Sequence, residues 1–274
     1  MEPIRQAVER AKADGLPTPE PQGRVSTNRR AADSMIVSGH PGVSRQYREA
    51  ELNREHLEAR RLIAHNAADP RSNAFDMLRT QVLQAMDQRN WQFLAVTSPT
   101  AGCGKTITAL NLALSIARQP ERSVFMLDLD LQRPHVADAL GIKCDRGLLS
   151  VLDGRASLRE VTYQARIDSH QFLVLPSEAS MLGSSELIAS RAMSTLLQNI
   201  KRDFRSHTVI LDMPPMLSSD DVIALLPQID CVLLVAAVGT STVSEIKQCS
   251  MHLQGAEVVR LVLNKSTEAT IGYG

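Results

Sequence analysis

Residues 92–114, QFLAVTSPTAGCGKTITALNLAL, run from an apolar strand through a glycine-bearing turn into a helix. Gly102 and Gly104 allow successive backbone N–H groups to curl around an anion, and the N-terminus of the helix adds partial positive charge. Lys105 and Thr106 open the helix, where the ammonium can reach the β- and γ-phosphates of a nucleotide and the hydroxyl can ligate Mg²⁺. This order predicts a P-loop that binds a nucleoside triphosphate.

The loop departs from the GxxxxGK[ST] pattern at its first position, where Pro99 replaces glycine. Proline still permits a turn, so nucleotide binding is favoured over a glycine-rich turn without a ligand. Cys103 lies at a helix N-terminus, where a thiolate is favoured, so one interpretation is a redox switch on nucleotide binding. The other is that this position tolerates many side chains, because the backbone does the binding. The loop residues expected to bind nucleotide are Thr100, Ala101, Gly102, Cys103, Gly104, Lys105 and Thr106.

Two further apolar segments end in carboxylates. VFMLDLD (124–130) ends in Asp128 and Asp130, and TVILDMPP (208–215) contains Asp212. The carboxyl ends of parallel strands face the ligand crevice, so all three should point at the phosphates, where phosphoryl transfer needs carboxylates for Mg²⁺ and for the nucleophile. The alternative is that each aspartate only ends a strand or forms a turn. The predicted catalytic residues are Lys105, Asp128, Asp130, Asp212 and Arg133, and the predicted metal ligands are Thr106, Asp128 and Asp212.

Strand and helix signals alternate from residue 92 onward, and the strands are almost continuously apolar. This pattern predicts an α/β fold with a doubly wound, mostly parallel sheet covered on both faces. Strands are expected at 92–97, 123–128, 171–175, 208–212, 231–236 and 258–263. Helices are expected at 72–90, 104–118, 190–204, 219–228 and 242–253, with shorter ones between 135 and 162.

The part of the chain ahead of the loop has a different composition. Residues 1–48 are polar and rich in Pro, Gly, Ser and Arg, which predicts a disordered arm with a short helix at 2–13. Residues 49–65 are highly charged and predict a helical lead-in, whose charges are typical of a solvated face. The P-loop domain is then expected over residues 66–274.

Charge and hydropathy limit the class of protein. Lys+Arg and Asp+Glu both number 30, so no charge excess points to nucleic acid or an anionic membrane as a partner. The longest apolar run, CVLLVAAV at 231–238, is far shorter than the roughly 18–20 residues that span a bilayer. The first residues lack the apolar core of a signal peptide, and four cysteines without paired or metal-ligand spacing favour a reduced cytoplasm. A cytoplasmic protein that meets a membrane only by association is therefore expected.

SPTAGCGKT, LDLDLQRP and VILDMPP together resemble the P-loop, second acidic and Walker B motifs of the bacterial tyrosine kinases of capsule and exopolysaccharide synthesis. These kinases belong to the deviant-Walker ATPases, which include division-site and partition ATPases. The resemblance covers about residues 66–265 and implies ATP and Mg²⁺ as cofactors and phosphate transfer to tyrosine hydroxyls. It also implies a membrane-embedded chain-length determinant, the polysaccharide co-polymerase, as partner at the inner membrane. In the resembled ATPases an Asn directly after the last strand contacts adenine, which makes Asn264 the candidate in this chain. The alternative is that Asn264 is an ordinary turn residue at the end of a strand.

Two departures from the family pattern concern the phosphate site. Partition-type relatives carry a Lys five positions before the P-loop Lys, and here that position is Thr100, which favours the polysaccharide branch. The second acidic motif of that branch reads DxDxR, but Gln132 occupies the position of the Arg and Arg133 follows it. An Arg there can stabilise charge that develops on the phosphate, whereas Gln cannot, so Arg133 is the candidate substitute.

Two further departures concern assembly and the acceptor. The family helix with the pattern ExxRxxR mediates ring assembly, and the matching stretch here keeps only Arg79, with Asn73 and Asp76 in the other positions. A homo-oligomer is thus expected only by another mode of assembly. The usual C-terminal tyrosine cluster is reduced to Tyr273, which is the candidate phosphoacceptor beside the simpler interpretation of a frayed tail.

Three functions remain open at this stage. The intact Lys105, Thr106 and aspartates favour an ATP-dependent tyrosine autokinase or ATPase that regulates polysaccharide polymerisation and export. Gln132, Asp76 and the missing tyrosine cluster favour a catalytically weak, nucleotide-dependent scaffold. A partition-type ATPase is disfavoured by Thr100 and by the balanced charge.

Overall fold

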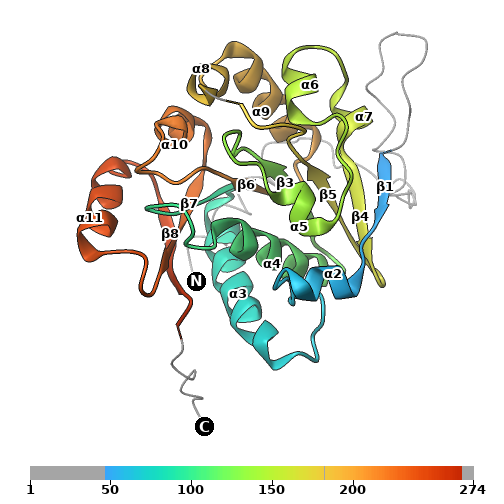
Figure 1. Cartoon of the computed structure of the whole chain (residues 1–274), viewed down its shortest axis with the longest axis horizontal. Coiled ribbons are helices and arrows are strands. Elements are labelled where there is room, and N and C mark those ends of the chain that lie inside the picture. Colours follow the sequence, from blue (N-terminus) through green and yellow to red (C-terminus); the bar gives the residue numbers. More distant parts are fainter. Residues whose placement is uncertain (1–46, 182, 267–274) are drawn as a thin grey trace, which may run out of the picture. The chain divides into compact units, whose positions relative to one another are not determined.

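The computed structural model describes residues 47–181 and 183–266, all of which belong to one compact unit, Gly42–Gly274 (Figure 1). A second unit, Met1–Pro41, lies outside the described residues, as do the predicted helix at 2–13 and the candidate acceptor Tyr273.

An eight-stranded sheet forms the centre of the unit. Its strands are β1 (Arg48–Glu51), β2 (Phe93–Thr97), β3 (Ser123–Asp128), β4 (Tyr163–Ile167), β5 (His170–Leu175), β6 (His207–Asp212), β7 (Cys231–Ala237) and β8 (Val258–Asn264). They lie in the order β1-β4-β5-β3-β6-β2-β7-β8. All neighbouring strands are parallel except β4 and β5, which form an antiparallel pair. The predicted mostly parallel α/β fold is confirmed.

Helices cover both faces of this sheet, as Figure 1 shows. One apolar cluster includes residues of α2 (Arg54–Ala59), α3 (Asn73–Arg89), α4 (Lys105–Ala117) and α5 (Val136–Leu140). The other includes residues of α6 (Leu148–Leu152), α7 (Leu158–Val161), α8 (Ser184–Ile188), α9 (Arg191–Asp203), α10 (Asp221–Leu225) and α11 (Val243–His252). Short 3₁₀ turns, η1 (Pro70–Ser72) and η2 (Leu226–Gln228), complete the described elements. The α4 helix is apolar nearly all round because it is buried nearly all round.

The lead-in at 49–65 differs from its prediction. Residues Arg48–Glu51 form strand β1 instead of a helix, and helix α2 covers only Arg54–Ala59 after the cap residue Asn53. Ladder hydrogen bonds from Arg48 N to Thr162 O and from Leu52 N to Arg166 O join this strand to β4. Tertiary pairing therefore overrides a charged composition that by itself favours a helix. The lead-in is part of the sheet domain, so the boundary placed at residue 66 is wrong.

Three other elements were not predicted as the structure has them. β4 follows a period-two burial pattern that its polar residues hide in the sequence. α8 was not expected, and the helix expected at 219–228 ends at Leu225, where η2 with its Pro227 begins.

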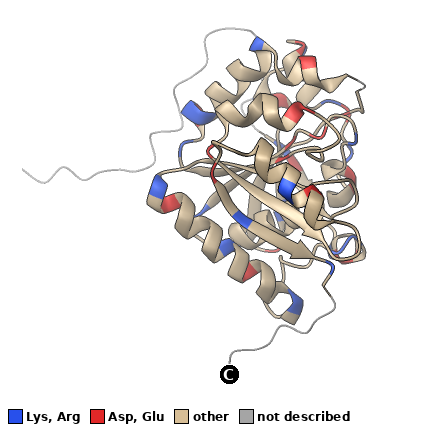
Figure 2. Cartoon of the chain, turned by 90° about the vertical axis from the view of Figure 1, so that its left-hand side faces the viewer, with Lys and Arg blue, Asp and Glu red and all other residues tan. Residues whose placement is uncertain are grey.

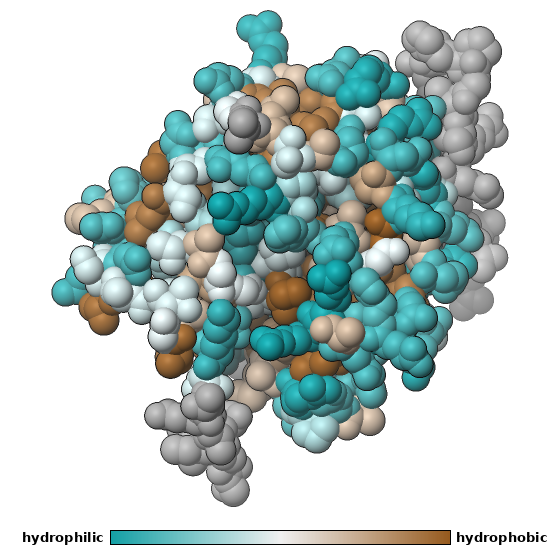
Figure 3. All heavy atoms as spheres, viewed as in Figure 1, coloured by the Kyte–Doolittle hydropathy of each residue, from teal (hydrophilic) through white to brown (hydrophobic). Residues whose placement is uncertain are grey.

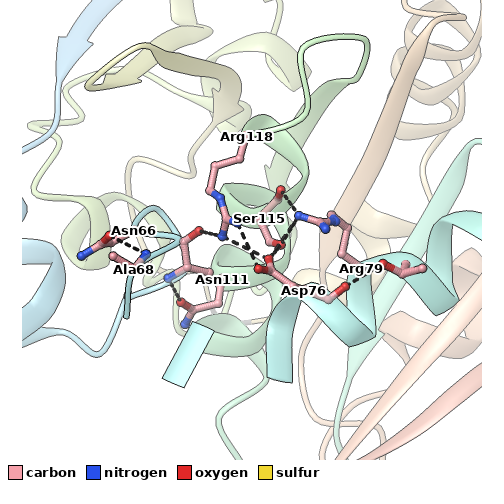
Figure 4. A network of polar contacts seen from close by, with 9 residues as sticks. Asn66, Ala68, Asp76, Arg79, Asn111, Ser115 and Arg118 are labelled. Carbon is pink, nitrogen blue, oxygen red and sulfur yellow. Dashed lines mark hydrogen bonds and ion pairs between the residues drawn. The ribbon is translucent and has the colours of Figure 1, made fainter. Parts of the chain in front are cut away.

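A polar network joins α3 to α4 at the position of the degenerate assembly motif (Figure 4). Asp76 accepts hydrogen bonds from Arg79 Nη1 at 3.1 Å and Ser115 Oγ at 2.5 Å, and it forms a bidentate pair with Arg118. Arg79 also donates to the Ser115 carbonyl oxygen, and its side chain is only 14% exposed. Arg79 is thus bound within its own chain.

The surface of the unit mixes charges and shows apolar residues at one edge. Figure 2 shows Lys and Arg interspersed with Asp and Glu along the exposed helices. Figure 3 shows brown, apolar residues on the side formed by α11 and β8, where Val243, Leu261 and Leu263 are more than half exposed. Strand β8 is the edge of the sheet on that side.

Candidate functional site

The P-loop connects β2 to α4 with its glycines in left-handed backbone conformations. Gly102 has φ +81° and Gly104 has φ +91°, which L side chains rarely adopt. A Cβ on Gly104 would lie 2.3 Å from Asn264 Nδ2, so a side chain there would also collide with its neighbour. The amide of Asn264 donates to the Cys103 carbonyl oxygen at 2.9 Å and thereby holds the loop from β8. The adenine contact expected of Asn264 stays a prediction.

Lys105 and two of the predicted aspartates meet at the N-terminus of α4. Lys105 Nζ lies 2.8 Å from Asp130 Oδ2 and 3.4 Å from Asp212 Oδ1. Thr106 Oγ1 donates to Asp212 Oδ2 at 2.6 Å. All four residues are buried. The structure therefore brings together the carboxyl ends of β3 and β6 with the start of α4, as the strand pattern predicted.

Burial and charge together shift the pKa values of this cluster. Burial by itself would lower the pKa of Lys105, but the nearby Asp212 and Asp130 carboxylates outweigh it and the pKa is raised. Burial, with a further contribution from Asp212, raises the pKa of Asp128 well above its usual value. Burial also raises the pKa of Asp212, although Lys105 and Thr106 oppose the shift. The site thus holds a lysine that stays protonated, beside two carboxyl groups, of Asp128 and Asp212, whose raised pKa values favour the neutral form.

Asp128 lies deeper than expected for a residue that contacts substrate. It pairs in register with Asp212 on the neighbouring strand and has no exposed surface. Its Oδ2 accepts the backbone N–H of Val136 at 3.0 Å, at the start of α5. Its Oδ1 is buried and has no hydrogen-bond partner among residues 47–181 and 183–266. Asp128 therefore holds the loop between β3 and α5 through Oδ2, and its Oδ1 remains available to accept a further contact.

A cleft of about 440 Å³ opens above these groups. It is lined by the expected Ala101, Gly102, Gly104, Lys105, Thr106, Asp130 and Arg133, and also by Gln132. Arg60, His135 and Asp138 line it as well, although the sequence did not single them out. Only spatial proximity identifies Arg60, because it follows a charged helix outside the loop and strand motifs.

Other predicted residues lie beside or beneath the cleft. Asp128 and Asp212 are fully buried and are not among the residues that line the cleft. The carbonyl oxygen of Thr100 accepts a hydrogen bond from Ser98 Oγ. The Cys103 thiol is buried, with Sγ 3.3 Å from Ser241 Oγ. Gln132 Nε2 lies 3.4 Å from Ser184 Oγ, so the residue in the position of the family arginine contacts α8.

The residues expected to hold Mg²⁺ fit that ion by chemistry. Mg²⁺ in nucleotide sites takes one or two carboxylates, hydroxyl oxygens and phosphate oxygens, and it retains water. The Thr106 hydroxyl, the Asp212 carboxylate and the unpartnered Asp128 Oδ1 supply hard oxygen atoms at one end of the sheet. Within the described ranges, no group of three His, Cys, Asp or Glu side chains is arranged to hold a metal ion by itself.

Residues 91–261, which contain the loop and all three aspartates, match the family model described as AAA domain. The chain belongs to this family. It is 29% identical over 197 residues to the tyrosine-protein kinase Etk of Escherichia coli strain K12, covering 72% of this chain and 26% of Etk. It is 26% identical over 251 residues to the tyrosine-protein kinase Wzc of Salmonella typhi, covering 91% of this chain and 32% of Wzc.

The kinase domain of the Escherichia coli tyrosine kinase Etk has a similar structure. The TM-score is 0.62 at 27% identity, covering 74% of this chain and 79% of that domain. The predicted resemblance to bacterial tyrosine kinases is confirmed. This chain spans about a quarter to a third of the length of Etk and Wzc. In residues 47–181 and 183–266, no helix has both the length and the apolar character needed to cross a membrane.

Proposed function

We propose that this chain binds Mg·ATP and transfers its terminal phosphoryl group to tyrosine hydroxyls. The observation that carries the proposal is the Lys105 ammonium, held by Asp130 and Asp212 at the N-terminus of α4. A triphosphate brings anionic oxygens to a helix N-terminus and a glycine loop, where backbone N–H groups and the helix dipole favour negative charge. Similarity to tyrosine-protein kinases supports the choice of acceptor.

The chain's own groups divide the work of such a transfer. Mg²⁺, when bound, would neutralise charge on the phosphate oxygens. Lys105 would turn from Asp130 toward the terminal phosphates, and Asp212 would orient the Thr106 hydroxyl. Asp130 lines the cleft, so we assign it the proton of the attacking tyrosine hydroxyl. The new bond joins tyrosine oxygen to phosphorus, the bond from phosphorus to the bridging oxygen breaks, and ADP leaves.

The cellular setting follows from the relatives as a proposal. We infer a membrane-embedded polysaccharide co-polymerase as partner, which would place the chain in the cytoplasm at the inner membrane and give it control over chain length and export. A homo-oligomer belongs to this proposal, but Arg79 is bound to Asp76 and Ser115 of its own chain. Assembly would therefore have to use other residues than the degenerate motif.

A second candidate function is a nucleotide-dependent scaffold that transfers little phosphate. The specific observation in its favour is Gln132, which occupies the position of the family arginine and contacts Ser184. The two functions share ATP binding and differ in turnover. Incubation with γ-labelled ATP and Mg²⁺, with label on protein separated from released phosphate, distinguishes them. Label on tyrosine supports the kinase, whereas tight binding with neither product supports the scaffold.

A further inference from the structure

One arginine reaches the cleft from outside the part of the chain that matches the AAA domain family. Arg60 ends helix α2, and it lines the same cleft as Gly102, Lys105 and Asp130. We infer that Arg60 contacts the terminal phosphate of the bound nucleotide. This inference rests on the proposed function, because it names a further binding residue of the same site.

The segment that carries Arg60 is fixed to the P-loop helix by one buried side chain. Asn111 of α4 accepts hydrogen bonds at Oδ1 from Ile63 N at 2.8 Å and Ala64 N at 3.0 Å. Its Nδ2 donates to the Arg61 carbonyl oxygen at 2.9 Å. Asn111 is fully buried. The backbone next to Arg60 is thus bound directly to the helix whose first residue is Lys105.

Helix α2 has a second anchor on α5. His56 Nε2 lies 2.9 Å from the Asp138 carbonyl oxygen, and Leu57 is fully buried in the apolar cluster. Strand β1, immediately before this helix, pairs with β4. A charged surface segment without function needs none of these attachments, whereas a residue that must meet a phosphate needs a defined position.

The guanidinium of Arg60 has donors to spare. Its Nη2 donates to Asp138 Oδ1 at 3.0 Å, and that is its one side-chain hydrogen bond to another described residue. The two side chains are 47% and 61% exposed, so the pair is weak and readily exchanged. A phosphate can accept two parallel N–H bonds from the guanidinium, a geometry that lysine cannot supply.

The order of strands places Arg60 at the phosphate end of the nucleotide. In P-loop proteins, the lysine at the position of Lys105 reaches the β- and γ-phosphates. Here Lys105 pairs with Asp130, two residues after the end of β3. Helix α5 follows β3, and α2 contacts α5 (Figure 1). Asn264, at the end of β8, lies on the opposite side of the loop, because β7 and β8 flank β2 on the other side from β3. With adenine at Asn264, as the family resemblance implies, the terminal phosphate would point toward Arg60.

This placement accounts for the missing family arginine. Gln132 turns toward Ser184 and brings no charge to the cleft. The cleft nevertheless carries three cationic side chains, those of Arg60, Lys105 and Arg133, against the carboxylates of Asp130 and Asp138. Without Arg60 these side-chain charges would balance, and only the backbone N–H groups of the loop and the helix dipole would attract an anion.

The test compares two nucleotides that differ in the terminal phosphate. Calorimetric titration of the full chain with AMP-PNP and with ADP, each with Mg²⁺, is performed on wild type, Arg60→Gln, Arg60→Lys and Arg54→Gln. Arg54 is the matched control, because it lies on the same helix in an ion pair with Asp168. Arg60→Gln should weaken AMP-PNP binding by about tenfold or more and leave ADP within about twofold of wild type. Arg60→Lys should recover part of the loss, and Arg54→Gln should change neither nucleotide.

Unchanged AMP-PNP affinity in Arg60→Gln, or an equal loss for both nucleotides, would overturn the inference while leaving ATP binding intact. A wild-type chain that binds neither nucleotide would instead overturn the proposed function. If Arg60→Gln does not fold, Asp138→Asn gives an independent answer. It removes the competing carboxylate, so AMP-PNP should bind more tightly relative to ADP; weaker relative binding would contradict the role of Arg60.

Discussion

Lys105 is buried among carboxyl groups, and this arrangement determines which side chains of the site are charged. Asp130 and Asp212 raise the pKa of the ammonium, so the lysine stays charged and ready for phosphate. Asp128 is the carboxyl group that burial makes hard to ionise, and the neighbouring Asp212 raises its pKa further.

Asp128→Asn should stabilise the fold and impair turnover. An aspartate with a raised pKa binds more protons folded than unfolded, so the free energy of unfolding falls as pH rises from the ordinary pKa of Asp toward the raised value. Asparagine removes this loss, so the melting temperature at neutral pH should rise and its decline with pH should flatten. Turnover should fall about a hundredfold, because the oxygen expected at the metal or nucleophile is replaced. Thermal melts between pH 4 and 8 and steady-state rates measure both effects.

Asp87→Asn is the control for this comparison, because Asp87 forms an exposed ion pair with Arg122 far from the site. It should reproduce neither the rise in melting temperature at neutral pH nor the loss of turnover. An Asp128→Asn variant that melts lower than wild type at neutral pH, with kcat within about twofold, would show that Asp128 only ends a strand.

Gly104→Ala should damage the loop through two separable effects. The left-handed backbone at φ +91° costs an alanine about 1–2 kcal/mol, and the new Cβ would collide with Asn264 Nδ2. The single variant should therefore lose nucleotide binding and stability, as measured by titration and urea unfolding. Adding Asn264→Ala should relieve the collision, and recovery is measured against the Asn264→Ala single variant, which loses the hydrogen bond to Cys103. Full recovery in the double variant would contradict the backbone part of this explanation, and no recovery would contradict the steric part.

At the scale of elements, the structure shows which sequence patterns carry enough information. The apolar strands β2, β3, β6 and β7 and the helix α4 were predictable, because they are buried on all sides and their hydrophobicity is continuous. β1 and β4 were not, because their residues are largely polar and their strand state depends on tertiary pairing, of β1 with β4 and of β4 with both β1 and β5. The position of Arg60 escapes prediction for the same reason, because strand β1, which leads into its helix, has a charged composition typical of a solvated helix.

The buried amide of Asn111 should prove essential to the lead-in. Asn111→Ala leaves the N–H groups of Ile63 and Ala64 and the carbonyl oxygen of Arg61 without their partner. The free energy of unfolding should fall by about 2–4 kcal/mol, because buried donors left unpaired cost about 1–3 kcal/mol each. Asn66→Ala is the control, because Asn66 is exposed and accepts from Ala68 N. Urea unfolding measures both variants. A loss of unfolding free energy for Asn111→Ala no larger than that for Asn66→Ala would contradict the role of Asn111 in holding residues 61–64.

At the scale of the whole molecule, the sequence was sufficient for six of the eight strands, the loop and the convergence of Lys105 with Asp130 and Asp212. It was insufficient for the depth of Asp128 and for the use of the Asn264 amide as a brace, because both depend on loop packing between distant strands. Tyr273, the predicted phosphoacceptor, lies outside the described residues.

Tyrosine phosphorylation should concentrate at Tyr273, because its immediate neighbours in the sequence, Gly272 and Gly274, have no side chain. Tyr163 is buried in β4 with its hydroxyl donating to the Lys143 carbonyl oxygen, so it should remain unmodified. Mass spectrometry after incubation with Mg·ATP distinguishes the three tyrosines. Phosphate found first on Tyr47 would move the acceptor to the N-terminal side of the domain.

The most direct test of the central claim is incubation of the full chain with γ-labelled ATP and Mg²⁺, alongside Lys105→Met. The variant removes the cation held at the α4 N-terminus and leaves Asp130 and Asp212 in place. Wild type should acquire label on tyrosine, and Lys105→Met should acquire it about tenfold to a hundredfold more slowly, because a charge-assisted contact worth about 1.5–3 kcal/mol is lost. Equal labelling of the two proteins, or ATP hydrolysis by wild type without any phosphotyrosine, would contradict the claim.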